Sequence, residues 1–347
     1  MMDDDKNKNL YKDRVTIYEV AKVAGVSLAT VSRVINMDKD DTHKAIHVRP
    51  ETEKKVKDAI NKLGYKPSAL AQGLASSKST NIGIMIPSTG YVYIANMLDG
   101  MIDVAKIYGY ISSIFITKRT KEDAAKVIEN LIMSHVDGAV IFDDELGTDE
   151  INSIAKYHIP LIAIGKDITG EALGSIQLEY KDPVMDVVKE HLLAGNDDVT
   201  ILNVVNDGKI SDDIRDGLLE FGKANGKNIK LFDTNDSYAI VYGAMKEYFK
   251  THKKGYFVAP RDSLAAAVVN AAHEANLRIP EDVQVLAEIG TKYSYIIRPE
   301  ISSFSIDMFK VGSIAVRMLT KLMEDPNFLT NKTMRIRATY NKRKTTL

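Results

Sequence analysis

The sequence predicts an α/β protein in which a small all-α head precedes a larger core of parallel sheets. Two patterns support this prediction. Residues 15–36 have the pattern of a helix-turn-helix, and beyond Asn81 short β-rich runs alternate with amphipathic segments of helical period. With 347 residues the chain is too long for one small core, so we expect two or three domains.

Composition indicates an ordinary globular protein with a basic N-terminal part. Hydrophobic residues make up 45% of the chain and charged residues 27%. The absence of cysteine excludes disulfides, thiolate zinc sites and cysteine nucleophiles, and it fits a reducing cytoplasm, the location we expect. No apolar run has membrane-spanning length, and the start MMDDDKNKN is unlike a signal peptide. Residues 1–78 carry 15 Lys and Arg against 11 Asp and Glu, a balance that suits phosphate binding.

The first helix of the head is defined by its two ends. Thr16 and Glu19 have the spacing of a capping box, which predicts a helix starting at Ile17. Gly25 then supplies the left-handed backbone conformation that ends the helix and turns the chain. Ser27 can cap a second helix directly afterwards.

The second helix has one inward and one outward face. Val31 and Val34 face the first helix, and the outward residues are Leu28, Ala29, Ser32 and Arg33. Short polar and small apolar side chains suit base edges and thymine methyl groups, and Arg33 suits guanine or phosphate. The alternative is a surface helical hairpin without a DNA role.

A charged loop and a third helix complete the head. The loop, residues 36–47, contains His43 and His47 four residues apart, but without a carboxylate or cysteine partner nearby we interpret them as solvated rather than as metal ligands. The third helix is expected to begin with Pro50 in its first turn and to end at Gly64; its buried stripe is Val56, Ile60 and Leu63.

The segment from residue 67 to residue 80 is predicted to be a short conditional helix. Ser68 can cap a helix over 69–75, and SSKST follows as a polar tether. The helix contains a glycine and presents only Leu70 and Leu74 as bulky outward residues, so in isolation it should be unstable. The alternative is an inert linker.

Beyond Asn81 the alternation of runs predicts βαβ units. The β-rich runs are NIGIMI, SSIFIT, GAVIF, PLIAI, VTILNVV, GYFVA and VQVLA. The amphipathic segments between them include 95–107, 121–133, 182–194, 211–224, 237–251 and 263–275. This repetition predicts two parallel sheets, each covered by helices on both faces.

An enzyme is the alternative that a doubly wound core invites. The sequence has no G-x-G-x-x-G after a strand, no G-x-x-x-x-G-K-[ST], no G-x-S-x-G and no H-E-x-x-H. Acidic clusters at 143–145 and 212–213 lie near strand ends, but charged loops are common there without a metal or a reaction. We therefore expect no catalytic residues, no metal and no cofactor. A soluble binding protein or enzyme remains the alternative from another class.

Several long segments together identify a family. They are VTIYEVAKVAGVSLATVSRVIN (15–36), YKPSALAQGLASSKSTNIGIMIP (65–87), HVDGAVIF (135–142), LAAAVVNAAHEANLRIPEDVQVLA (264–287), IIRPEISSF (296–304) and MFKVGSIAVRMLTKLM (308–323). In this order they resemble the lactose-repressor (LacI/GalR) family of bacterial transcription regulators. The resemblance implies a core of two Rossmann-like lobes, as in periplasmic binding proteins, with a ligand cleft between them.

The resemblance also divides the chain. It implies a disordered lead at 1–14, a helix-turn-helix DNA-binding domain at 15–66, a hinge helix and linker at 67–80, and an effector-binding and dimerisation core at 81–347. The first lobe would take about 81–179 and 308–325. The second would take about 180–306 and 330–347, including a strand near Thr333–Ala338.

The expected DNA contacts follow from both the residues and the resemblance. Leu28, Ala29, Thr30 and Arg33 are predicted to read major-groove bases. Thr16, Tyr18, Ser27, Ser32 and Asn36 are predicted to hold phosphates or set the register. In the family, two hinge helices pair in the minor groove and insert one leucine each. The resemblance assigns this wedge to Leu74, with Ala71 beside it and Ser68 at the start of the helix. We expect Leu74→Ala to weaken operator binding more than non-specific binding.

The effector cleft departs from the family pattern. An R-x-x-G motif becomes I-R-D-G, with Ile214 in place of the arginine and Arg215 one residue later. Residues 287–289 stand where the family usually has a G-F-D motif, so Ile289 replaces the usual aspartate. The candidate effector contacts are Tyr91, Arg215, Asp262 and Arg298. A sugar needs several convergent polar partners, so the changes argue against a free sugar. The alternatives are a larger or phosphorylated ligand, or none.

A protein partner is the other input that the resemblance implies. Regulators of carbon catabolism in this family bind the phosphocarrier HPr, phosphorylated on serine, through the helix that resembles 308–323. The corresponding residues here are Phe309, Ile314, Arg317, Met318 and Lys321. A guanidinium group suits a phosphate. Phe309 replaces a usual tyrosine and Lys310 a usual aspartate, and a solvated helix face is the alternative.

The sequence thus predicts a cytoplasmic, homodimeric regulator, expected to be a repressor of carbohydrate or carbon-catabolite genes. It would bind a palindromic operator under the control of phosphorylated HPr, a small effector, or both. The alternative within the same fold answers to a non-sugar or phosphorylated small molecule without HPr. We expect no membrane association.

Overall fold

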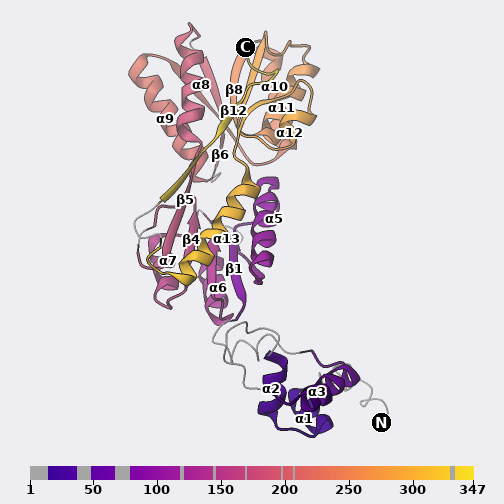
Figure 1. The fold of residues 1–347 in the computed structure, drawn as a ribbon. Helices are drawn as coiled ribbons and strands as arrows, with labels where there is room; N and C mark the ends of the chain where they lie inside the picture. The colour runs from indigo at the N-terminus through magenta and orange to yellow at the C-terminus, as the bar shows by residue number, and fades with distance from the viewer. Residues whose placement is uncertain are drawn as a thin grey trace, which may run out of the picture. The chain divides into compact units, whose positions relative to one another are not determined.

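The computed structural model describes residues 15–36, 48–66, 79–117, 121–143, 146–168, 170–196, 198–205, 208–328 and 333–347. The chain forms two compact units, residues 1–79 and 80–347 (Figure 1). The predicted lead, 1–14, and most of the segment at 67–80 lie outside the described residues.

The head consists of three helices around a small apolar core. They are α1 (Ile17–Ala24), α2 (Leu28–Asn36) and α3 (Pro50–Leu63). Gly25 and Gly64 end α1 and α3 with φ of 66° and 64°, which confirms both predicted helix ends. Val20, Val31 and Val56, one from each helix, are fully buried at the centre. Ile60 and Leu63 are only half-buried, because Ala59 takes the inner position on α3.

The first lobe contains a six-stranded parallel sheet in the order β11-β5-β4-β3-β1-β2. Its strands are β1 (Asn81–Ile86), β2 (Ile111–Ile116), β3 (Gly138–Ile141), β4 (Leu161–Ile164), β5 (Leu173–Glu179) and β11 (Thr333–Arg337). Its helices are α5 (Val92–Ile107), α6 (Lys121–Met133), α7 (Thr148–Ala155) and α13 (Met308–Glu324). Alternate strand residues point to opposite faces. Ile82 and Ile84 therefore pack toward α5 and α13, while Met85 packs toward α6 and α7.

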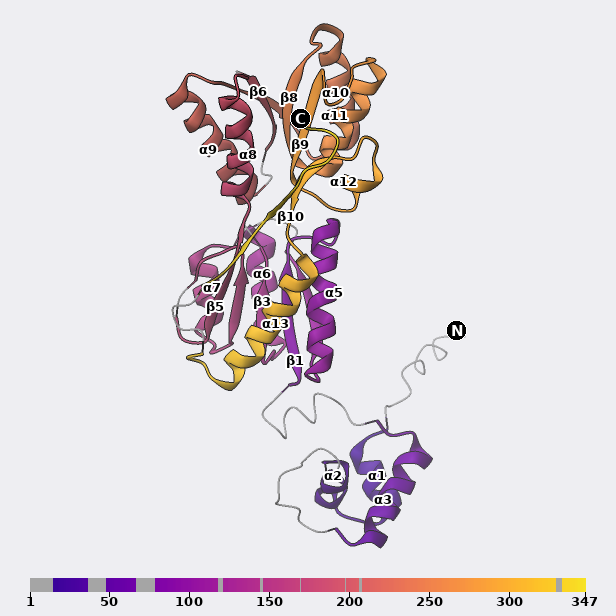
Figure 2. The same ribbon diagram turned by 45° about the horizontal axis from the view of Figure 1, so that its top comes forward.

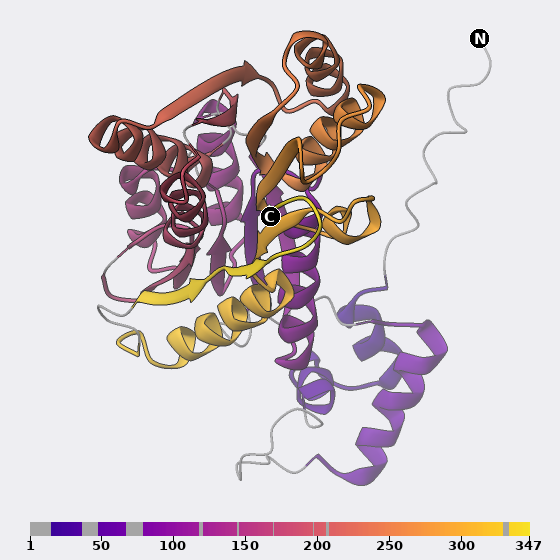
Figure 3. The same ribbon diagram turned by 90° about the horizontal axis from the view of Figure 1, so that it is seen from above.

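The second lobe contains a sheet in the order β12-β10-β9-β8-β6-β7. Its strands are β6 (Asp198–Val204), β7 (Asn228–Thr234), β8 (Gly255–Arg261), β9 (Val283–Ile289), β10 (Ser302–Ser305) and β12 (Thr339–Asn341), the last antiparallel to β10. Its helices are α8 (Lys181–Leu193), α9 (Lys209–Asn225), α10 (Tyr238–Thr251), α11 (Asp262–Glu274) and the short α12 (Tyr293–Ile296). Helices α8 and α9 cover one face and α10 and α11 the other (Figure 3).

The placement of the C-terminal strand near Thr333–Ala338 in the second lobe was wrong. Strand β11 pairs in parallel with β5 of the first lobe, from Thr333 opposite Ser175 to Arg337 opposite Glu179. Only β12, after Ala338, joins the second sheet. The reason is connectivity: α13 ends at the far side of the first lobe, and the returning chain adds to that sheet before it reaches the other lobe. The chain therefore crosses between the lobes at 179–181, 305–308 and 337–339 (Figure 2).

Helices α5 and α13 lie side by side on the first sheet at very close range (Figures 1 and 2). Gly100 of α5 faces the backbone of Phe309, and Gly312 of α13 faces the backbone of Met97. A Cβ atom at either glycine would overlap the facing carbonyl oxygen. The missing side chains are what allow the two backbones to approach.

Candidate DNA-binding surface and inter-lobe cavity

Helix α2 presents the outward face that the sequence predicted. Ser27 caps it by accepting a hydrogen bond from the backbone N–H of Thr30 over 3.3 Å, and the two hydroxyls lie 2.9 Å apart. Leu28 is 36% exposed, and Ala29 and Arg33 are also exposed. Thr30 and Ser32 are half-buried. The helix thus offers a short row of small and basic groups to solvent.

The start of α1 contributes a second group of candidates. The backbone N–H of Thr16 donates to Glu19 Oε2 over 2.7 Å, and the Thr16 hydroxyl donates to the same oxygen over 3.0 Å. These bonds, the backbone one first, lower the pKa of Glu19 below its ordinary value. Tyr18 is 69% exposed. Helix N-termini carry backbone N–H groups that bind phosphate, so this end of α1 suits a DNA backbone.

Several predicted DNA contacts fall where side chains are not described. Ser68, Ala71 and Leu74 lie outside the described residues, as do His43 and His47. The backbone of Asn36 ends α2, and its side chain is not among those described. Their roles stay predictions.

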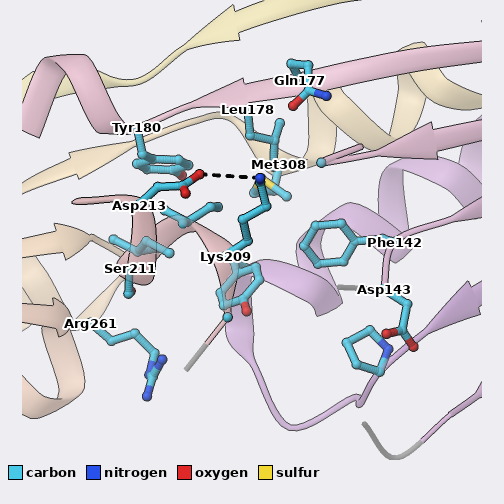
Figure 4. Close-up of a pocket in the computed structure, with 16 residues that line it drawn as sticks. Phe142, Asp143, Gln177, Leu178, Tyr180, Lys209, Ser211, Asp213, Arg261 and Met308 are labelled. Carbon is cyan, nitrogen blue, oxygen red and sulfur yellow. Dashed lines mark ion pairs between the residues drawn. The ribbon is translucent and has the colours of Figure 1, made fainter. Parts of the chain in front are cut away.

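A cavity of about 110 Å³ lies between the two lobes of the core (Figure 4). It has room for several non-hydrogen atoms rather than a single water molecule. Aromatic and apolar groups form much of its wall, among them Tyr93, Phe142, Leu178, Tyr180, Ile289 and Met308. Its polar groups are Asp143 and Gln177 from the first lobe and Lys209, Ser211, Asp213 and Arg261 from the second.

The charged groups of the cavity already have partners within the chain. Asp143 is 2% exposed and accepts a hydrogen bond from the hydroxyl of Thr117. At the start of α9, Lys209 Nζ lies 3.8 Å from Asp213 Oδ2 (Figure 4). The Ser211 hydroxyl donates to Glu288 Oε2 of the same lobe over 2.8 Å. The Tyr180 phenol is deeply buried, which raises its pKa. At neutral pH it is therefore a hydrogen-bonding group and not an anion.

The four predicted effector contacts do not line this cavity. Tyr91 reaches the second lobe and donates through its hydroxyl to Asp236 Oδ2 over 2.9 Å. Asp262 is 1% exposed and accepts hydrogen bonds from the loop that follows β9. Arg298 is 70% exposed at its side chain and donates to nearby carbonyl groups of its own loop.

Arg215 does not line the cavity and makes its contacts beside the C-terminal end of β6. It contacts Asp212 over 2.6 Å, Asp216 over 2.9 Å and Asn203 over 3.2 Å. Ile214, which occupies the position of the family arginine, is fully buried in the core. The helix therefore directs neither residue into the cavity.

The described residues of the two acidic clusters show no arrangement of metal ligands. Asp213 lines the cavity, and Asp212 pairs with Arg215. Of the first cluster only Asp143 is described. Within the described ranges no group of three or more His, Cys, Asp or Glu side chains could hold a metal ion.

Helix α13 carries the residues predicted for a protein partner. Phe309 is 45% exposed, Ile314 is half-buried, and Arg317 and Lys321 are exposed. The Lys321 ammonium lies 4.9 Å from the centre of the Phe328 ring. Met318 was wrongly assigned to this surface. It is 7% exposed, because its position on the helix turns it into the core.

Comparison with known proteins finds matches for both the head and the core. The model described as "Bacterial regulatory proteins, lacI family" matches residues 16–68, and that of a "Periplasmic binding protein-like domain" matches residues 199–346. Catabolite control protein A from Staphylococcus epidermidis is 29% identical over 316 residues, which cover 90% of this chain and 93% of the relative. This chain carries the DNA-binding domain of the lacI family. It is a DNA-binding transcription regulator, as its sequence predicted.

Solved structures of lacI-family regulators share the fold. The lac repressor dimer bound to operator and the anti-inducer ONPF matches with a TM-score of 0.78 and 22% identity, over 96% of this chain and 100% of that chain. A lacI-family regulator from Silicibacter pomeroyi matches with a TM-score of 0.80 and 18% identity, over 95% and 99%. The predicted fold class is confirmed. Among the described residues, no helix has the length and apolar character needed to cross a membrane.

The sequence reasoning missed Lys209 and Arg261 as cavity residues of this core. One signal was available, since Arg261 ends a strand and directly precedes Asp262. The carboxyl ends of parallel strands are where α/β proteins place ligands. Which of two adjacent polar residues faces the cleft depends on strand register, and a single sequence does not reveal it.

Proposed function

We propose that this regulator binds a palindromic operator as a homodimer and represses carbohydrate or carbon-catabolite genes. The observation that carries the DNA-reading part is the exposed row Leu28, Ala29 and Arg33 on α2, held by a helix that packs its valines inward. An arginine on such a face can donate two hydrogen bonds to guanine. The relative named catabolite control protein A supports the choice of genes.

A gel shift with a palindromic site tests the DNA-reading face. We expect Arg33→Ala to weaken operator binding by about 1–3 kcal/mol and to relax specificity at one base position. Lys62→Ala is the matched control, because Lys62 is an exposed basic residue in the last turn of α3, away from the α2 row. The DNA-reading role would be refuted if both variants bound operator and random DNA like the wild type. Affinity should also fall steeply with added salt.

The proposed homodimer is supported by an apolar edge of the first lobe. Strand β2 is at the end of its sheet, and Ile114 and Ile116 are 44% and 40% exposed. Ile114 pairs with Ile84, which points toward α5, so these side chains lie on the α5 side of the sheet. On α5, Ile102 and Ile107 are 39% and 73% exposed. Exposed apolar patches on a sheet edge mark interaction sites, and a symmetric dimer would cover this one.

The cavity supports a small effector that is not a free sugar. Ile289, Leu178 and Met308 present apolar atoms to it. A sugar hydroxyl buried against them without a partner would cost about 1–3 kcal/mol. Calorimetric titration with glucose, maltose and a sugar phosphate tests this proposal. Binding of a free sugar at micromolar concentration would overturn it.

Control by HPr phosphorylated on serine is supported by the exposed Arg317 and Lys321 on α13, with Phe309 and Ile314 beside them. Titration of phosphorylated and unphosphorylated HPr into the regulator tests it. We expect binding only of the phosphorylated form and its loss in Arg317→Ala. Arg335→Ala, at an arginine with a 59% exposed side chain on β11, is the matched control. Absence of binding to wild type would leave the alternative, a regulator that answers to a small molecule alone.

A further inference from the structure

Three side chains from both lobes meet beside the inter-lobe cavity. Tyr91 precedes α5 in the first lobe, whereas Asp236 follows β7 and Arg261 ends β8 in the second. The Tyr91 hydroxyl donates to Asp236 Oδ2 over 2.9 Å. The other carboxylate oxygen, Oδ1, lies 2.5 Å from Arg261 Nη2. One carboxylate therefore joins a tyrosine of one lobe to an arginine of the other.

The arginine end of this network is shielded from water, whereas its carboxylate is accessible. The Arg261 side chain is 9% exposed and that of Asp236 is 37% exposed. Hydrogen bonds to a charged group are stronger than those between neutral groups. The Arg261 guanidinium also lies 5.6 Å from the centre of the Tyr91 ring, within the range of a cation–π contact. Tyr91 is thus held against the second lobe through both its hydroxyl and its ring.

One of the three residues also lines the cavity. Arg261 is part of the cavity wall, and so is Tyr93, whose ring stacks on Tyr91 at 5.5 Å between centres. An occupant of the cavity (Figure 4) would therefore contact Arg261, which pairs with the carboxylate that Tyr91 of the other lobe binds. Because Tyr91 and Asp236 belong to different lobes, rotation of one lobe away from the other requires the hydrogen bond between them to break.

We propose that Tyr91, Asp236 and Arg261 form a latch that keeps the two lobes closed without a ligand, and that a cavity ligand acts on closure through Arg261. The latch goes beyond the proposed function, because lobe closure is a property of the core alone. Loss of one hydrogen bond to the Asp236 carboxylate should shift the ratio of open to closed core by roughly tenfold or more.

Distances between spin labels on the two lobes test the latch. The chain has no cysteine, so Glu122→Cys on α6 and Glu247→Cys on α10 provide two unique label sites, with side chains 83% and 71% exposed. The labelled full-length chain is mixed with excess unlabelled chain, so that each measured distance lies within one protomer. No DNA or ligand is added. The variants are Tyr91→Phe and Asp236→Asn, and the control is Tyr157→Phe, which removes the hydroxyl of a 61% exposed tyrosine.

We expect the wild type and Tyr157→Phe to share one narrow distance distribution. Tyr91→Phe and Asp236→Asn should add a second, longer distance. The proposal is overturned if both variants fold, as judged by circular dichroism, and keep the wild-type distribution, or if the wild type itself is already broad. DNA binding is assayed separately by gel shift, so failure of the latch and failure of the operator proposal give different results.

Discussion

Asp262 shows how one buried carboxylate fixes a loop of the second lobe. Its Oδ2 accepts hydrogen bonds from the backbone N–H groups of Thr291 over 2.5 Å and Ser294 over 2.9 Å, and from both hydroxyls over 2.9 Å. We expect Asp262→Asn to lower the free energy of unfolding by about 1–3 kcal/mol. The asparagine NH2 group donates hydrogen bonds itself, so it cannot accept those that the loop donates to the carboxylate. Urea unfolding measures the loss. Asp186→Asn, with a 65% exposed side chain, is the control, and an equal effect in both would contradict the prediction.

Asp282 gives the stability a pH dependence of known sign. The Arg278 side chain donates to its two oxygens over 2.9 Å each, and with the Arg278 backbone N–H it lowers the pKa of Asp282 from 3.8 to about 2. A carboxyl group with a depressed pKa stabilises the fold above its unfolded pKa and loses this effect as the pH falls. We expect the difference in Tm between wild type and Asp282→Asn to be constant at neutral pH. It should shrink as the pH falls from 3.8 toward about 2. A difference that grows in acid would refute this assignment.

Features decided by neighbouring residues could be predicted from the sequence. The bond from Thr16 to Glu19 and the turn at Gly25 depend on a few adjacent positions, and both formed as predicted. The cavity was harder, because Asp143, Lys209 and Arg261 come from three separate elements. Their meeting depends on how the lobes pack, which no local pattern encodes.

Gly312 controls how closely α5 and α13 pack. We expect Gly312→Ala to destabilise the core by about 1–3 kcal/mol, since the new methyl group would overlap the carbonyl oxygen of Met97 and force the helices apart. Gly243→Ala in α10 is the matched control. A Cβ there meets nothing within 4 Å, so alanine should be neutral or stabilising. Thermal unfolding of both variants checks this, and equal Tm values would contradict it.

The elements with strong hydrophobic periods were predicted, and those without them were missed. β1 and α6 coincide with the predicted run and segment, and α8 differs by one residue at each end. Strand β7, an edge strand with the alternating sequence NIKLFDT, gave no continuous apolar run. Strand β5, LGSIQLE, contains small and polar residues, although its first four residues are all buried. Burial there comes from the helices on both faces of the sheet.

At the scale of the whole molecule, the three crossings link the lobes to the surfaces proposed for regulation. The third crossing joins β11 and β12, which belong to different sheets although only Ala338 separates them. The second crossing leads directly from β10 into α13, which carries Arg317 and packs on α5. A change in lobe closure would therefore reach α13 and α5 without passing through a flexible segment. The sequence predicted two sheets but not that β11 and β12 would join different ones. Strands that pair with partners far away in the chain leave no local pattern.

Dimerisation of the whole chain should depend on the apolar edge formed by β2 and α5. We expect Ile114→Asp to weaken the dimer by roughly tenfold or more, because a carboxylate would be buried against apolar groups of the partner. The matched control is Leu193→Asp, which changes an isolated leucine that is 66% exposed at the end of α8. Sedimentation velocity at several concentrations measures the monomer–dimer equilibrium. Operator affinity should fall with the dimer in Ile114→Asp and stay at the wild-type value in Leu193→Asp. A dimeric Ile114→Asp variant would show that another surface holds the protomers together.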